Sequence, residues 1–254
     1  MILDRRTFIK LTGLGLLALA AKPAIDLLSR PEIARAFEEG KATPNRWAMA
    51  VDLRACTADQ GCQDCADACH RVHNVPDIGT PKEEVKWIWP ASYREAFPEQ
   101  DETAAGALRD TPVLLLCNHC DNPPCVRVCP TQATWRRDDG IVMMDYHRCI
   151  GCRYCMAACP YGSRSFNWRD PQPYIENIDA SYPARTRGVV EKCNFCEERL
   201  AQGQKPACVE ACKSGALIFG DMSPGTDFYM MISNSFSIVR KPELGTRPHV
   251  YYII

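Results

Sequence analysis

Cysteine is the residue type whose number and spacing could do chemistry, with 16 among 254 residues. This count exceeds what side-chain packing requires and is too low for a miniature disulfide scaffold. The cysteines fall into four groups of four, and most of the intervals between groups are long and free of cysteine. The groups are Cys56, Cys62, Cys65 and Cys69; Cys117, Cys120, Cys125 and Cys129; Cys149, Cys152, Cys155 and Cys159; and Cys193, Cys196, Cys208 and Cys212.

The third group, followed by Pro160, matches the C-x2-C-x2-C-x3-C-P run of bacterial ferredoxins. Three cysteines of such a run sit on a tight loop and bind one [4Fe–4S] cluster. The fourth, one helical turn further on, points toward a neighbouring cluster. Gly151 suits this loop because glycine tolerates a positive φ. Two antiparallel motifs therefore exchange their fourth ligands and hold two clusters.

Two other cysteine chemistries fit the spacing less well. A tetrahedral zinc site takes two separated cysteine pairs, whereas the third group packs four cysteines between positions 149 and 159. The even number would permit eight disulfides, but C-x2-C-x2-C brings neighbours too close for good bridge geometry. A structural zinc protein and a disulfide-rich exported protein remain remote alternatives. The sequence predicts four [4Fe–4S] clusters.

Which cysteine group pairs with which is inferred by elimination. The second and third groups lie close together and both end in Cys-Pro, whereas His70 and Lys213 follow the first and fourth groups. We therefore pair the second group with the third, and the first with the fourth. The predicted ligand sets are Cys56, Cys62, Cys65 and Cys212 (cluster 1); Cys69, Cys193, Cys196 and Cys208 (cluster 2); Cys117, Cys120, Cys125 and Cys159 (cluster 3); and Cys129, Cys149, Cys152 and Cys155 (cluster 4).

Short strands are expected on either side of the cysteine motifs. Residues 47–53 alternate in polarity, and residues 133–145 form a predicted hairpin around Asp139-Gly140. Further short strands are expected at 113–116, 165–168 and 216–219. The predicted fold is α+β: two bacterial-ferredoxin-like two-cluster units, one inserted in the other, with long loops and a wrapping C-terminal tail. The expected ranges are 37–70 with 188–221 (outer unit), 71–111 (insertion), 112–187 (inner unit) and 222–254 (tail).

The insertion and the tail raise separate expectations. A connection as long as 71–111 is usually functional, so we expect it to contact a partner, with Trp87 and Trp89 alternatively capping a cluster. The tail combines a predicted helix with Pro242, Gly245 and Pro248, and is expected to wrap the body or reach a neighbouring subunit.

The N-terminal residues 1–36 have the features of an export signal. Arg5 and Arg6 precede a short apolar stretch, too short to span a bilayer, and resemble the twin-arginine motif. That route exports folded proteins, which suits a chain that acquires metal in the cytoplasm. Two small-x-small sites are present, and we favour cleavage after Ala36 over Ala20; retention as an anchor stays open.

The remaining sequence excludes several function classes. A formal charge of −1 does not favour nucleic-acid binding, and 46% hydrophobic residues exclude disorder. No catalytic triad, phosphate loop or carboxylate pair is evident, so we expect no small-molecule substrate on this chain. Side chains near the motifs could tune or bond a cluster, or could simply be surface groups: His119, His147, Arg148, Arg153, Lys192 and Lys205.

Three segments together resemble a known family: Cys117 to Cys125, Cys149 to Gly162, and Lys192 to Cys196. The chain is similar, over about residues 47 to 220, to the four-cluster electron-transfer subunits of membrane respiratory complexes. Their partners include molybdopterin reductases for dimethyl sulfoxide, polysulfide and tetrathionate. Two departures are the five-residue gap after Cys56 and Lys213 in place of proline.

The tail, Lys241 to Tyr252, looks most like that of the periplasmic iron–sulfur subunit of the Dsr sulfite-reductase-associated transmembrane complex. This resemblance implies non-catalytic electron transfer in the periplasm. It also implies a polytopic quinone-interacting membrane subunit, a multihaem cytochrome c and other subunits of a transmembrane redox complex. The subunit would be bound peripherally to the membrane through these partners. Electron transfer for a periplasmic tetrathionate- or polysulfide-type reductase, or for nitrite reductase, is the alternative.

Overall fold

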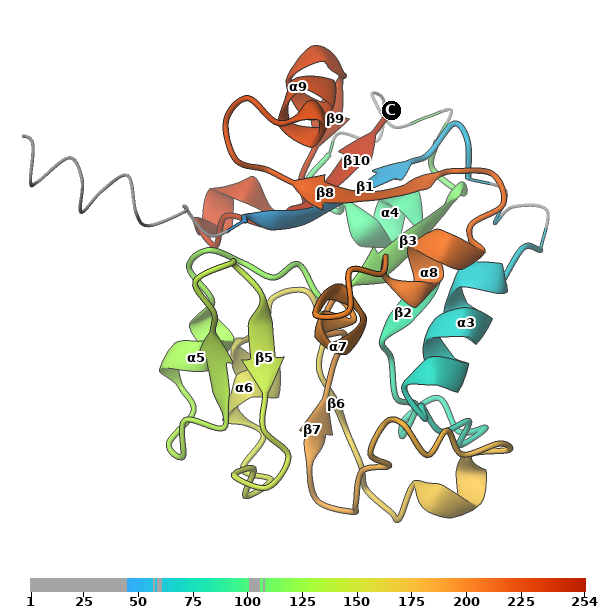
Figure 1. Cartoon of the computed structure of the whole chain (residues 1–254), viewed down its shortest axis with the longest axis vertical. Helices are drawn as coiled ribbons and strands as arrows, with labels where there is room; N and C mark the ends of the chain where they lie inside the picture. The colour runs from blue at the N-terminus through green and yellow to red at the C-terminus, as the bar shows by residue number, and fades with distance from the viewer. Residues whose placement is uncertain (1–44, 57, 59–60, 101–105, 107) are drawn as a thin grey trace, which may run out of the picture. The chain divides into compact units, whose positions relative to one another are not determined.

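The computed structural model describes residues 45–254 except positions 57, 59–60, 101–105 and 107. Arg5, Arg6 and both predicted cleavage sites lie outside the described residues. The described part has small sheets and short helices (Figure 1), which agrees with the predicted α+β class. The helices are α3 (Asp64–Val72), α4 (Tyr93–Ala96), α5 (Pro124–Arg127), α6 (Tyr154–Ala158), α7 (Glu197–Leu200), α8 (Ala207–Ala211) and α9 (Asp227–Asn234), with 3-10 turns at Gln172–Tyr174 and Pro242–Leu244.

The main sheet joins the first and last described strands of the chain. Its order is β8-β1-β10-β9, with β1 antiparallel to β8 and parallel to β10. Met49 pairs with both Phe219 and Val250. The four strands are β1 (Trp47–Asp52), β8 (Leu217–Asp221), β9 (Ser237–Ile238) and β10 (Val250–Ile253).

Three two-stranded sheets accompany the main sheet. The predicted hairpin is confirmed: β4 pairs antiparallel with β5, and Gly140 has a φ of 88° at the turn. The other pairs are β2 with β3 and β6 with β7, both antiparallel. Their bounds are β2 (Ile88–Ser92), β3 (Pro112–Leu116), β4 (Thr134–Arg136), β5 (Val142–Met144), β6 (Ser165–Phe166) and β7 (Val190–Glu191).

Strand β1 is buried on both faces, which explains its central position. Met49 and Val51 face the largest apolar core, whereas Ala48 and Ala50 face α9. Helix α9 lies so close to β8 that a Cβ added at Gly220 would be only 2.5 Å from Cβ of Phe228. The sheet is therefore covered on both sides, and small residues are needed on the side of α9.

The insertion is more ordered than the sequence predicted. Strand β2, which pairs with β3, was not expected in 71–111. Trp87 is fully buried and stacks on His73 with ring centroids 4.5 Å apart. Its Nε1 donates to Glu191 at 2.9 Å. Trp87 therefore packs inside the chain, and contact of the rest of the insertion with a partner stays a prediction.

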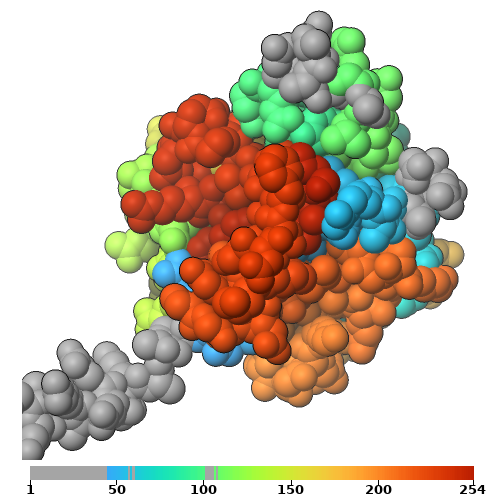
Figure 2. Space-filling model, turned by 90° about the horizontal axis from the view of Figure 1, so that it is seen from above, coloured from blue at the N-terminus to red at the C-terminus, as the bar shows by residue number. Residues whose placement is uncertain are grey.

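The tail follows the body and then enters its sheet. The predicted helix is α9, and the segment after it runs beside residues 118–122, with His249 N–H donating to Asn118 O at 2.8 Å. Strand β10 then inserts between β1 and β9, a role that the sequence analysis did not predict. In Figure 2 the orange and red C-terminal residues cover most of the face shown.

Candidate metal centres

Short helices bring the cysteine motifs together in pairs. Helix α3 carries Cys65 and Cys69 and contacts α8, which carries Cys208 and is directly followed by Cys212 (Figure 1). Helices α5 and α6 contact each other in the same way. Helix α5 contains Cys125 and α6 contains Cys155, with Cys159 directly after it. The motif pairs that meet are thus first with fourth and second with third.

All four cysteines of the predicted cluster 3 set line one cavity, together with Pro123, Tyr161 and Arg164. All four of the cluster 4 set line another, together with Ile150 and Arg153. In both cavities the fourth cysteine comes from the partner motif. The cysteines lining the first are Cys117, Cys120, Cys125 and Cys159, and those lining the second are Cys129, Cys149, Cys152 and Cys155.

In the predicted sets 1 and 2, the thiols of each set lie close enough to raise one another's pKa. Burial, and then the charges of Cys212, Cys56 and Cys62, raise the pKa of Cys65 to about 12. Cys56 reaches this set despite the five-residue gap that follows it. Burial raises the pKa of Cys69 well above its usual value, and the thiols of Cys193, Cys208 and Cys196 raise it further.

The four sets form one series. Cys65 of set 1 interacts electrostatically with Cys69 and Cys208 of set 2. Cys117 of set 3 interacts with Cys193 of set 2 and adds to the burial that raises the pKa of Cys193 to about 12. The charge of Cys125 of set 3 in turn raises the pKa of Cys155 in set 4, after the larger effect of burial.

Exposure changes along this series. Cys62 in set 1 is exposed, and Cys129, Cys149 and Cys152 in set 4 are half-buried. The cysteines of set 2 are all buried, as are three of the four in set 3. The two ends of the series therefore approach the surface while its middle is shielded from water.

Local backbone geometry aims N–H groups at the sulfurs. The N–H of Phe195 donates to Cys193 Sγ and the N–H of Ala207 to Cys196 Sγ, both at 3.4 Å. Gly151 has a φ of 70°, as predicted, and its α-hydrogen side faces the carbonyl of Gly188. Four converging thiolates with N–H donors around them fit a [4Fe–4S] cluster, whose sulfurs are hydrogen-bond acceptors.

The residues that follow the fourth and first cysteine groups, where the other groups have proline, have different surroundings. Nζ of Lys213 lies 2.8 Å from Oδ2 of Asp64, so the end of α8 is tied to the start of α3. His70 is half-buried after Cys69, and burial lowers the pKa of its imidazole. At Lys213 an ion pair within the outer unit therefore stands in place of the proline.

The side chains suggested as cluster neighbours have different surroundings. Lys192 is buried. His119 stacks on Phe195 with centroids 3.7 Å apart, and its Nδ1 accepts from Val142 N–H at 3.0 Å. Arg153 lies over the ring of Trp168. Of the rest, His147 and Lys205 are exposed, and Arg148 is exposed and pairs with Asp145.

Two side chains that touch the cysteines were missed. Arg164 Nη2 donates to Cys125 Sγ at 3.1 Å. The Thr246 hydroxyl of the tail hydrogen-bonds the Cys120 thiol and Tyr161 Oη. Neither lies in a cysteine motif. The only sequence signal was their position, Arg164 shortly after Pro160 and Thr246 in a tail that was expected to wrap the body.

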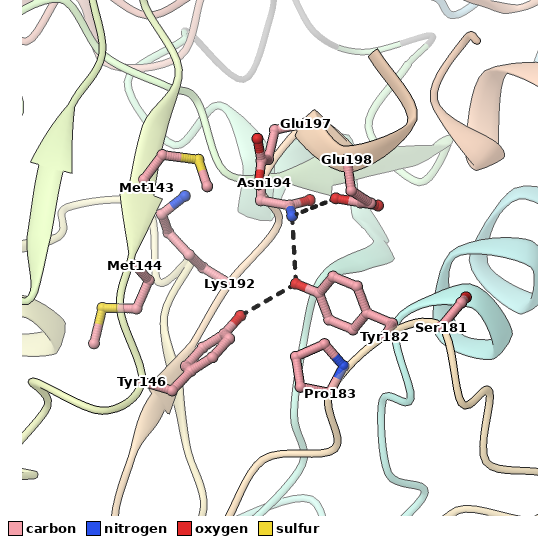
Figure 3. A pocket seen from close by; sticks show the side chains of 10 residues that line it. All are labelled: Met143, Met144, Tyr146, Ser181, Tyr182, Pro183, Lys192, Asn194, Glu197 and Glu198. Carbon is pink, nitrogen blue, oxygen red and sulfur yellow. Dashed lines mark hydrogen bonds between the residues drawn. The ribbon is translucent and has the colours of Figure 1, made fainter. Parts of the chain in front are cut away.

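A cavity of about 270 Å³ is lined by Lys192 and Asn194, the two neighbours of Cys193 in the chain (Figure 3). Tyr182 Oη accepts from Asn194 Nδ2 at 3.3 Å, and the same amide donates to Glu198 at 2.9 Å. Lys192 lies on its opposite wall, and its Nζ donates to the carbonyl of Cys193 at 2.7 Å. No cysteine lines this cavity, so it adds no thiolate ligand.

The comparisons with known proteins agree with this geometry. A family model described as "4Fe-4S dicluster domain" matches residues 113–174 and 173–222. The chain is 38% identical to the Hdr-like menaquinol oxidoreductase iron–sulfur subunit 1 of Archaeoglobus fulgidus, over 99% of this chain and 98% of that protein.

Two further relatives have related names. A tetrathionate reductase subunit from Salmonella typhimurium is 36% identical, over 98% of this chain and 88% of its own length. The iron–sulfur cluster-binding subunit of menaquinone reductase from Nitratidesulfovibrio vulgaris is 37% identical, over 82% of this chain and 88% of its own length.

Proposed function

This chain belongs to the family of ferredoxin-type [4Fe–4S] electron-transfer subunits of respiratory oxidoreductase complexes. On that basis we propose a path for electrons through the chain and the partners at its two ends. It is a non-catalytic subunit that carries multiple [4Fe–4S] clusters. Four clusters, one in each cysteine set, would relay single electrons between a quinone-interacting membrane subunit and a cytochrome c. The observation that carries this proposal is the single series of four sets with its two ends near the surface.

The bound clusters supply one-electron redox chemistry, and the chain supplies their positions. The thiolates of each set fix one site, and exchange of the fourth ligand between motifs holds neighbouring sites together. Burial of Cys193, Cys208, Cys117 and Cys120 keeps water from the two middle sites. The N–H groups of Phe195 and Ala207 stabilise negative charge on the sulfurs of set 2.

Within the family we propose a place in a Dsr-type sulfur-metabolism complex. The tail carries the resemblance, and the name of the Archaeoglobus relative, a menaquinol oxidoreductase subunit, supports a quinone-linked partner. We propose a periplasmic location, supported by the Arg5-Arg6 pair. Among the described residues, none of the helices is both long and apolar enough to span a bilayer.

A second candidate is electron transfer for a periplasmic molybdopterin reductase. The similarity to the tetrathionate reductase relative over 98% of this chain favours it. Both candidates use the same four cysteine sets and differ only in the partner that exchanges electrons with them.

Purification of the native assembly in mild detergent separates the two candidates. The assembly is assayed for iron, sulfide, covalent haem and molybdopterin. Haem c without molybdopterin supports the Dsr-type complex, and molybdopterin without haem supports the reductase. A chain with bridged cysteines or bound zinc, in place of about 16 iron ions expected for four clusters, would contradict the relay itself.

A further inference from the structure

Arg164 is a buried cation whose neighbours are cysteines. The residue is only 4% exposed. Nη2 donates to Cys125 Sγ at 3.1 Å and to Thr134 Oγ1 at 2.8 Å, and Nη1 lies 3.8 Å from Met144 Sδ. These contacts hold the guanidinium in one orientation against the wall of set 3.

No carboxylate pairs with Arg164 among the residues that the structure describes. The groups that raise its pKa, against the opposing effect of burial, are the thiols of Cys125, Cys155, Cys117 and Cys159. Another buried arginine, Arg185, has an ordinary partner in Glu191 at 2.6 Å. A buried cation without a partner is strongly unfavourable, so the arrangement around Arg164 requires negative charge on the cysteine sets.

The two sets that Arg164 faces are sets 3 and 4. Cys117, Cys125 and Cys159 belong to set 3, and Cys155 belongs to set 4. The guanidinium therefore lies at the junction through which an electron passes between the two inner sites.

We propose that Arg164 is the shared counter-ion of clusters 3 and 4 and raises the reduction potential of both. The inference rests on the proposed relay. Each electron that enters a site adds one negative charge, and no proton or bond change accompanies it. A fixed cation at short range in a poorly hydrated interior stabilises that added charge. It also weakens the repulsion between two neighbouring sites when both are reduced.

The surroundings of the outer sets differ. The hydrogen-bond partners of the Arg164 side chain all lie in the inner unit, whereas set 2 has a separate buried cation, Lys192, whose Nζ donates to the carbonyl of Cys193 at 2.7 Å. At Cys196 the charge of Glu198 opposes that of Arg199. Loss of Arg164 should therefore act on two sites of the four and leave the outer pair unchanged.

The test is a potentiometric titration of the anaerobically purified native assembly, followed by electron paramagnetic resonance. In Arg164→Gln, two of the four midpoint potentials should shift downward, and the other two should stay. In Arg164→Lys, which retains the positive charge, the same two midpoint potentials should lie close to their wild-type values. The matched control is Arg136→Gln, which removes a cation of the inner unit that is already paired with Asp121.

A second variant places an opposing charge beside the guanidinium without removing it. Met144 lines the cavity of set 4 and not that of set 3, so the response of cluster 3 reports on the guanidinium. Met144→Glu places a carboxylate beside Nη1, and Met144→Gln is its uncharged match. The glutamate variant should lower the same two potentials relative to the glutamine variant, even if Arg164→Gln fails to retain iron.

The outcomes separate a failure of the role of Arg164 from a failure of the relay. A fully loaded assembly whose potentials do not move, or move equally at all four sites, overturns the role of Arg164 alone. An equal shift in Arg136→Gln does the same. A wild-type assembly that contains no [4Fe–4S] clusters overturns the relay on which the role depends.

Discussion

Nη2 of Arg185 lies 2.6 Å from Oε2 of Glu191, and neither side chain has any exposed surface. Glu191 also accepts from Trp87 Nε1 and from the amide of Asn167. Arg185 donates in addition to the carbonyl of Asn74 at 2.8 Å. One buried ion pair therefore connects the insertion, the segment after α3 and the strand that leads into the fourth cysteine motif.

Breaking this ion pair should destabilise the whole body. Arg185→Met leaves Glu191 buried without its counter-ion, and we expect a loss of about 3–5 kcal/mol of unfolding free energy. Anaerobic urea unfolding followed by the visible absorbance of the clusters measures it. The control is Arg148→Met, which removes an exposed partner of Asp145 and should cost less than about 1 kcal/mol. Equal costs for the two variants would contradict the prediction.

Gly151 should be essential for set 4. An alanine there must adopt a φ of 70° and place its Cβ 2.4 Å from the carbonyl oxygen of Gly188. We expect Gly151→Ala to lose about four iron ions per chain, measured as iron against protein. Gly162→Ala is the matched control, because Gly162 has a φ of 65° but no atom within 4 Å of the added Cβ. It should retain its iron. Loss of iron from both variants would mean that the positive φ alone, and not the contact with Gly188, makes glycine necessary.

The assignment of the fourth ligands can be tested by double substitution. Cys159→Ser should perturb the cluster 3 site, with a loss of about one to four iron ions per chain. Adding Cys117→Ser should remove little more, because both cysteines line one cavity. Adding Cys149→Ser should instead perturb a second site, since Cys149 lines the other cavity. If Cys159→Ser combined additively with Cys117→Ser and not with Cys149→Ser, the exchange of ligands would be wrong.

Acid should destabilise the join between the tail and the body. Burial lowers the pKa of His249 below 6.5, although the charge of Asp121 opposes this. Below pH 6.5 the unfolded imidazole therefore binds a proton that the folded one does not. Stability is lost as the pH falls from 6.5 toward the lower folded pKa, by up to about 1.4 kcal/mol per pH unit.

The measurement compares urea midpoints at about pH 7.5 and about pH 5.5. His249→Gln should show a smaller acid loss than the wild type. His147→Gln, which alters an exposed imidazole, should keep the wild-type loss. An unchanged pH dependence in His249→Gln would exclude His249 as its source.

The cysteine motifs were predictable because their information is local. Four ligands within eleven positions, as from Cys149 to Cys159, restrict both the metal and the backbone around it. The hairpin at Asp139-Gly140 was predictable for the same reason, since its turn chemistry is local. The ligand sets themselves stay a prediction, supported by the two cavities and by the thiol interactions.

The missed features depend on contacts distant in sequence. Arg164 follows Gly162 and Ser163 in a polar stretch, where an arginine ordinarily lies at the surface. Its burial depends on Cys125 and Thr134, which come from another motif. Strand β10 is short and follows Pro248, so its pairing with β1 could not be inferred from its own residues.

The position of β10 also determines when the protein can be completed. Because Val250 pairs with Met49, about 200 residues must be synthesised before β1 gains this neighbour. At about 5–20 residues per second, that delay is on the order of 10–40 s. The first cysteine group directly follows β1. While the other three groups are synthesised, β1 therefore still lacks its pairing with β10. We therefore expect the outer cluster sites to be completed later than the inner ones, whose two cysteine motifs are separated by only 19 residues.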